Sequence, residues 1–253
     1  MEDQLQALGL VANRVDAVTP SDIPAEVRAE LCDRRRPSYR RENELACTFS
    51  HKKAWRAILE QGHEQAVVLE DDALLSPKLP AFLDSLSGVQ FDVLRFEAAA
   101  RKVRILPSTD VLPGGVQLRP FRSTLFGSSG YVITADTIRK IIDHPNVGRL
   151  PIDVALYDSF YEPSRRLRRL HSDPAFCVQV GSLPASGSVG RDDVGRNDMD
   201  DSGEVHLYAK EHPIRHALGK SLRGVYRGGL NALDHLLHLP KGLTSERVRF
   251  AED

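Results

Sequence analysis

Ala66-Val67-Val68-Leu69-Glu70-Asp71-Asp72 is a short apolar run that ends abruptly in three carboxylates. A continuous aliphatic run of this length is typical of a strand that is buried on both faces. Ligands of open α/β sheets bind in the crevice beyond the carboxyl ends of the strands, so acids in this position face a binding site. The stretch therefore predicts a layered α/β fold and a functional cluster at one edge of its sheet.

The flanking segments alternate between helical and strand patterns. Apolar residues recur at helical spacing over 44–60, and Gly62 follows as a C-cap. Ser76-Pro77 starts a further helix. The other expected elements are strands at 15–18, 91–96, 130–133 and 175–180, a hairpin within 101–120, and helices at 135–143 (capped by Thr134) and from Pro151. This alternation predicts an α/β layered domain with a mostly parallel sheet.

The composition is ordinary for a globular protein. The 253 residues suffice for one α/β domain with an appendage. The net charge of −1 produces no strong overall field, so no nucleic-acid partner is expected. Three widely spaced cysteines without a C-x-x-C pair argue against a disulfide framework and a structural zinc site. No stretch has the length and apolarity of a membrane span, and the N-terminus lacks the regions of a signal peptide, so the expected location is the cytoplasm.

The three acids suit a hard divalent cation. Mg²⁺ and Mn²⁺ prefer oxygen ligands and commonly take one or two carboxylates together with substrate phosphates. Adjacent residues of an extended strand point to opposite faces, so the three carboxylates cannot all bind one ion directly. We expect Asp72 to bind the metal and Glu70 to orient it or bind it through water. We expect Asp71 to contact a sugar or ribose of the bound substrate. The alternative is an exposed acidic turn with no ligand.

Several motifs in a fixed order carry a resemblance to a known family. They are Glu44-Leu45-Ala46-Cys47-Thr48-Phe49-Ser50-His51 with Trp55, the stretch 66–73, Gly127-Ser128-Ser129-Gly130-Tyr131-Val132-Ile133, Pro151-Ile152-Asp153, and Val178-Gln179 with Ser186-Gly187-Ser188. Together they resemble glycosyltransferase family 25, whose members include bacterial lipooligosaccharide galactosyltransferases and animal collagen galactosyltransferases. The resemblance covers residues 1–193. It implies a GT-A-like, Rossmann-type domain that binds a nucleotide-sugar donor such as UDP-galactose, dependence on Mn²⁺ (or Mg²⁺), and inversion at the anomeric carbon.

The same resemblance suggests roles for individual residues. Asp153, which follows a proline at a helix start, is expected to be the catalytic base, although interaction with the helix dipole would also explain it. His51 contacts the donor diphosphate, or it is simply a hydrogen-bonded helix histidine. Ser129, in the small-residue turn, is expected to contact the donor, and Gln179 and Ser188 to bind its sugar hydroxyls.

One family element has no counterpart in the pattern. Residues 1–18 resemble the helix and strand that follow the family's first strand, whose end helps to hold the nucleotide. No such strand precedes them in this sequence. The expected domain therefore lacks the family's first strand.

The sequence changes character after residue 180. Residues 181–204 are rich in Gly, Ser and Asp, which predicts a flexible loop or lid between a catalytic domain at 1–180 and a helical segment at 205–253. Residues 206–250 carry eight basic and three acidic side chains, a net charge of +5, with apolar residues near one helical face. A basic amphipathic helix suits the anionic surface of an inner membrane, and packing on the main domain is the equal alternative.

These interpretations combine into a metal-dependent inverting glycosyltransferase in the cytoplasm, peripheral on the inner membrane. It would move a hexose, galactose foremost, from a UDP-sugar to a saccharide or lipid-linked acceptor of lipopolysaccharide or lipooligosaccharide. Two alternatives stay open. One is a metal-dependent phosphohydrolase or nucleotidyltransferase that uses the same carboxylates, and the other is a degenerate saccharide-binding protein without catalysis.

Overall fold

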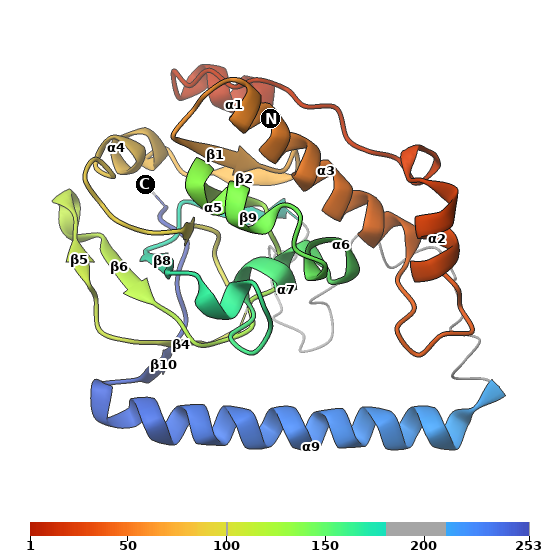
Figure 1. Ribbon diagram of the computed structural model, residues 1–253. Helices are drawn as coiled ribbons and strands as arrows, with labels where there is room; N and C mark the ends of the chain where they lie inside the picture. The colour runs from red at the N-terminus through yellow and green to blue at the C-terminus, as the bar shows by residue number, and fades with distance from the viewer. Residues whose placement is uncertain (100, 181–210, 253) are drawn as a thin grey trace, which may run out of the picture.

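The computed structural model describes residues 1–99, 101–180 and 211–252. A six-stranded sheet lies at the centre of the domain, with helices on both sides of it (Figure 1). In spatial order its strands are β1 (Gln65–Leu69), β7 (Gly130–Thr134), β3 (Val93–Arg95), β8 (Arg169–Asp173), β6 (Gln117–Pro120) and β5 (Asp110–Val111). The predicted α/β class is confirmed.

The predicted mostly parallel sheet is wrong. Of the five pairs of neighbouring strands in this sheet, β3 with β8 is parallel and the other four are antiparallel. Nevertheless β1, β3 and β8 run in one direction, because β7 is antiparallel to both β1 and β3. The alternation of strands and helices indicated that shared direction. It could not reveal that β7 inserts between β1 and β3, since strand order depends on contacts between distant parts of the sequence.

The two faces of the sheet form two apolar cores. On β7, Tyr131 and Ile133 join one core and Val132 joins the other, as the alternation of a strand requires. The first core is covered by α3 (Glu42–Glu60), α5 (Ala135–Ile141), α6 (Asn146–Arg149) and α7 (Ile152–Tyr157), and the second by α4 (Leu79–Asp84). Thr134 caps α5 as predicted, because its side chain accepts a hydrogen bond from Thr137 N.

The N-terminal region lies outside the sheet. Residues 1–64 form α1 (Glu2–Ala7), a 3-10 turn at Pro20–Asp22, α2 (Ala25–Leu31) and α3, and no strand. β1 is therefore the first strand of the chain, and it forms one edge of the sheet. The strand predicted at 15–18 is wrong. Val18 N donates to Ser50 Oγ at 2.8 Å, so this backbone is held against α3 rather than against another strand.

Two antiparallel pairs attach segments that flank the sheet. β2 (Ala73–Leu75) pairs with β9 (Cys177–Gln179), and β4 (Val103–Ile105) pairs with β10 (Thr244–Glu246). Before β10, α9 (Pro213–His238) runs as a long rod along one side of the domain (Figure 1). Among the described residues, none of the helices combines the length and apolarity that a membrane span requires. The predicted loop at 181–204 lies outside the described residues.

Candidate active site

Helix α3 directs one row of side chains toward the end of β1. Cys47, His51 and Trp55 follow one another at intervals of four residues, so they share a helix face. Tyr131 Oη, fully buried on β7, lies 2.9 Å from Trp55 Nε1 and 2.8 Å from His51 Nδ1. An indole N–H can only donate, so the tyrosine oxygen accepts from Trp55. If Tyr131 donates its own proton to Nδ1, the protonated His51 Nε2 is left to donate to Glu70 Oε1 at 3.1 Å.

Glu70 is surrounded by donors. Besides His51, the hydroxyl of Ser128 donates to Oε1 at 2.5 Å and that of Ser129 to Oε2 at 3.3 Å. Burial acts to raise the pKa of Glu70, but the hydrogen bond and charge of His51 and the two hydroxyls outweigh it and lower the pKa. Glu70 is thus an ionised carboxylate whose two oxygens are both engaged by protein groups.

The turn that brings the two serines to Glu70 depends on its glycines. Gly127 has φ +86°, in the left-handed region that side chains rarely adopt, and an added Cβ would collide with Glu97 Oε1. A Cβ at Gly130 would collide with Cys177 Sγ and would lie 2.8 Å from Phe96 Cε2. The small residues of this turn are therefore required by close packing, which explains why the motif carries glycine at both of its ends.

A buried ion pair lies beneath the turn. Glu97 Oε2 accepts from Ser129 N at 2.9 Å and lies 3.1 Å from a guanidinium nitrogen of Arg95. Burial raises the pKa of Glu97 to about 7, although the charge of Arg95 opposes this rise. Arg95 also donates to Phe126 O at 2.9 Å, so the ion pair fixes the backbone that enters the turn.

Asp72 differs from Glu70 in having one carboxylate oxygen that no group of the described residues satisfies. Gln179 Nε2 donates to Oδ2 at 2.7 Å, and the pairing of β2 with β9 places Gln179 opposite Ala73. Oδ1 is buried and has no hydrogen-bond partner in the described residues. Burial raises the pKa of Asp72, and the charges of Glu70 and Asp71 add to the rise. A divalent cation at Oδ1 would satisfy this oxygen and relieve the repulsion, so Asp72 fits the predicted metal.

Asp153 stands at the start of α7, next to the small-residue turn. Its Oδ2 accepts from Gly127 N at 3.2 Å and its Oδ1 from Val154 N at 2.7 Å. Burial raises the pKa of Asp153, while the two backbone hydrogen bonds and the charges of Arg40 and Arg95 oppose the rise. An aspartate with a raised pKa is a stronger proton acceptor than an ordinary surface aspartate.

Three carboxylates of the site affect the pKa of one side chain, that of Cys47. Burial, followed by the charges of Glu70, Asp153 and Asp72, raises the pKa of the Cys47 thiol to about 12. Three of the predicted site acids are therefore close enough to affect the same side chain. Cys47 itself was missed by the sequence interpretation, and its spacing of four residues from His51 is the signal that could have found it.

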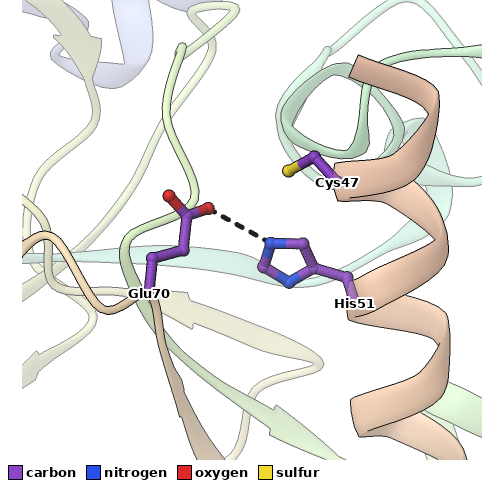
Figure 2. A group of neighbouring side chains, drawn as sticks. All are labelled: Cys47, His51 and Glu70. Atoms are coloured by element: carbon purple, nitrogen blue, oxygen red, sulfur yellow. Dashed lines mark hydrogen bonds and ion pairs between the residues drawn. The ribbon is translucent and has the colours of Figure 1, made fainter. Parts of the chain in front are cut away.

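Figure 2 shows Cys47, His51 and Glu70, which each offer one atom that could bind a metal. These three atoms lie within 4.8 Å of one another, a spacing that a metal ion could bridge. The surrounding bonds argue against this use. Both ring nitrogens of His51 already have partners, and a thiol with a pKa of about 12 is protonated. His51 and Glu70 therefore fit a hydrogen-bonded support, with the protonated Cys47 beside them, better than a metal centre, whereas Asp72 has an oxygen without a partner among the described residues.

The predicted site residues fall into connected groups. His51 and Ser129 contact Glu70, Gln179 contacts Asp72, and Asp153 contacts the backbone of the small-residue turn. Asp71 is exposed beside them. Ser188 lies outside the described residues. Ser128 and Tyr131 belong to a motif of the sequence, but no role was predicted for them or for the pair of Arg95 and Glu97, because their importance follows from contacts across the sheet. The individual roles assigned to these residues stay predictions.

Comparison with known proteins points to one family. The family model described as glycosyltransferase family 25 (LPS biosynthesis protein) matches residues 1–156, which include most of the groups described above. Procollagen galactosyltransferase 2 of Homo sapiens is 24% identical to the chain over 147 residues, which are 52% of this chain and 23% of that protein. Its counterpart in Mus musculus is 23% identical over the same shares. The chain thus spans 23% of the length of these curated relatives.

Proposed function

The chain belongs to glycosyltransferase family 25, as the order of its motifs predicted, and from this premise we propose that it transfers a hexose from a nucleotide sugar to a saccharide acceptor. The donor is a UDP-sugar, with galactose as the sugar, and the acceptor is a saccharide of lipopolysaccharide or lipooligosaccharide. The names of the two relatives support galactose. The observation that carries the proposal is the buried, unpartnered oxygen of Asp72 beside a fixed carboxylate cluster.

In this proposal the domain is of the GT-A type and Asp72 holds Mn²⁺ or Mg²⁺. Its free Oδ1 supplies one ligand, and Gln179 fixes the orientation of the carboxylate by donating to Oδ2. Exposed Asp71 faces the sugar or ribose. When bound, the metal would supply positive charge against the negative charge that develops on the departing diphosphate.

Glu70 has a supporting role in this scheme. Both of its oxygens already accept hydrogen bonds from protein donors, so a direct bond to the metal would have to displace one of them. By holding His51, Ser128 and Ser129 together, Glu70 joins the end of β1 to the small-residue turn. Asp153 is attached to the same turn through Gly127 N. Glu70 thereby sets the position of the metal-binding acid relative to the base.

Asp153 is the proposed base. The acceptor hydroxyl oxygen forms a bond to the anomeric carbon while the bond from that carbon to the phosphate oxygen breaks, which inverts the configuration. The hydroxyl proton passes to a carboxylate oxygen of Asp153, and the bonding electrons leave with the nucleoside diphosphate. The raised pKa of Asp153 makes it a stronger acceptor of that proton than an ordinary aspartate.

A panel of UDP-sugars with Mn²⁺ and a truncated lipooligosaccharide acceptor tests the proposal. We expect transfer from one UDP-hexose, UDP-galactose first, and a loss of about a thousandfold in Asp72→Asn, because a metal ligand contributes several kcal/mol to the transition state. Asp136→Asn is the matched control, since Asp136 is an exposed acid on α5 that pairs with Lys140. Full transfer by Asp72→Asn would refute the assigned site.

Two further assays separate the alternatives. Hydrolysis of a phosphate ester with Mn²⁺, without any glycosyl transfer, would favour a phosphohydrolase. Saccharide binding without measurable affinity for UDP and Mn²⁺ would favour a non-catalytic binding protein. A procollagen peptide in the acceptor panel tests whether the chain shares the acceptor that the names of its relatives indicate.

A further inference from the structure

Helix α9 is fastened to the domain through polar groups. Arg227 pairs with Asp158, and Asn231 Oδ1 accepts from a guanidinium nitrogen of Arg104 at 2.6 Å. Asp234 accepts from Arg122 Nε at 3.0 Å. Arg227, Asn231 and Asp234 follow one another at intervals of four and three residues, so they share one face of the helix. This face is turned to the domain.

The opposite face is apolar and exposed. Leu218, Leu222 and Val225 are 59%, 61% and 75% exposed. In this order, they precede the domain-facing residues Arg227, Asn231 and Asp234 by nine positions each. Nine residues correspond to roughly two and a half turns of α-helix, which places the two sets on opposite sides. The exposed stripe continues in both directions; its members are Ile214, Leu218, Leu222, Val225, Leu233 and Leu236. We define these six residues as the outer face of α9.

The exposed charges on α9 are all positive. Asp234 is the helix's single acid, and it is buried against Arg104 and Arg122 of the domain. Arg215, Lys220 and Arg223 are exposed, and no acid of the described residues forms an ion pair with them. Arg215 precedes Leu233 by eighteen positions and so lies at the edge of the outer face, whereas Lys220 and Arg223 precede Arg227 by seven and four positions and so lie on the polar side of the helix.

We propose that the outer face of α9 docks on an anionic lipid bilayer, with the helix axis parallel to the membrane surface. An apolar face that enters the boundary between headgroups and acyl chains, with cations on the polar face of the helix, is the arrangement by which amphipathic helices bind such surfaces. Each cation near the surface strengthens binding about fivefold. The domain lies on the other side of the helix, where it does not obstruct contact with the bilayer (Figure 1).

A second copy of the chain fits this face less well. A coiled coil would use a seam that includes Gly229 and Ala232 between Val225 and Leu236, and these small residues remove the side chains that must interlock. The helix also carries four basic residues and one acid, so pairing two copies would bring like charges together. A bilayer requires no interlocking side chains and complements the charge.

The docking helix is linked to the candidate site. Asp158, the partner of Arg227, is the C-cap of α7, the helix that begins next to the proposed base Asp153. If the proposed function holds, a lipid-linked acceptor embedded in the same bilayer would reach the enzyme close to that base. The docking itself does not depend on transfer, so it is measured without turnover.

Co-sedimentation with vesicles tests the proposal. The full chain is mixed with vesicles of phosphatidylcholine containing about one third phosphatidylglycerol, and with vesicles of phosphatidylcholine alone. We expect binding to the anionic vesicles that weakens as salt is added. The double variant Leu222→Glu/Val225→Glu should bind about a hundredfold more weakly, because it removes two apolar anchors and adds negative charge. Val11→Glu is the matched control, since Val11 is 98% exposed outside α9.

A second variant tests the contribution of the positive charges, and circular dichroism checks that the helix still forms. Arg215→Gln/Lys220→Gln/Arg223→Gln should weaken binding to the anionic vesicles about a hundredfold, and circular dichroism should show the same helix content. The proposal is overturned if the wild type does not sediment with anionic vesicles, or if the two multiple variants bind as tightly as the wild type. It is also overturned if light scattering shows a dimer that Leu222→Glu/Val225→Glu dissociates, because the outer face would then bind a second copy.

Discussion

Around Glu70, polar side chains lie within the domain between apolar layers, whereas along α9 the polar side chains face the domain and the apolar ones face outward. In the first region both carboxylate oxygens of Glu70 and of Asp153 accept hydrogen bonds, whereas Asp72 Oδ1 has no partner among the described residues. In the second, the apolar stripe contributes nothing to the domain's own core. The difference shows what each region offers to a ligand among the described residues: a carboxylate oxygen without a partner in the site, and an exposed apolar face on the helix.

The largest expected effect is on the chemistry of the site. Asp153→Asn keeps one oxygen, which can accept from either Gly127 N or Val154 N but not from both, and it cannot take up the proton of the acceptor hydroxyl. We expect kcat to fall by about 10²–10⁴, roughly 3–5 kcal/mol, with little change in KM for the donor. Steady-state kinetics with the UDP-sugar identified by the panel measure this. A variant with unchanged kcat would show that another group accepts the proton.

The next effect concerns pH, and it arises from the buried pair beneath the turn. Burial raises the pKa of Glu97 to about 7 from the ordinary value of 4.5. Between these values the native state therefore binds more protons than the unfolded state, and the free energy of unfolding falls as the pH rises. Relative to Glu97→Gln, the wild type should lose on the order of 3 kcal/mol across this window. Urea unfolding at several pH values measures the difference, and parallel curves would contradict the assignment.

A glycine of the site should tolerate no side chain. Gly130→Ala places a Cβ against Cys177 Sγ and Phe96, so the tightly packed turn must shift. We expect a loss of about 1–3 kcal/mol in the free energy of unfolding and a parallel loss of transfer. Thermal unfolding followed by circular dichroism gives the first quantity. Wild-type stability would mean that the turn relaxes without resistance.

A glycine of α9 should behave in the opposite way, with the smallest effect. Gly228 has nothing within 4 Å of an added Cβ, and it lies inside the helix. Gly228→Ala should therefore stabilise the chain by up to about 1 kcal/mol and leave vesicle binding unchanged. The same unfolding assay compares it directly with Gly130→Ala. If both variants shift stability in one direction, the contrast between a packed turn and an open helix does not hold.

The sequence predicted those parts of the fold that depend on local patterns. The helix at 44–60, the strand before Glu70 and the cap at Thr134 follow from periodicity and capping, and the structure confirms them. β8 was missed because its residues Arg169–Asp173 read as a polar segment, although Arg169 and His171 are buried. Its burial is made tolerable by partners elsewhere in the chain, such as Tyr157 O for Arg169, which no local pattern reveals.

The same distinction applies to the site. The acidic triplet was visible in the sequence because charge directly after an apolar strand is unusual. The different surroundings of Glu70 and Asp72 could not be predicted from the sequence. Glu70 is saturated by Ser128 and Ser129, which lie 58 and 59 positions away, while Asp72 is paired across 107 positions with Gln179. Such partners are set by the order of strands in the sheet, which the local sequence patterns did not predict.

Calorimetric titration of the chain with UDP, in the presence and absence of Mn²⁺, tests whether Asp72 joins a metal to the donor diphosphate. We expect Mn²⁺ to tighten UDP binding by about tenfold or more, and we expect Asp72→Asn to abolish this gain while Asp136→Asn retains it. If UDP binds equally with and without Mn²⁺, or if Asp72→Asn keeps the full gain, then Asp72 does not hold a metal against the diphosphate.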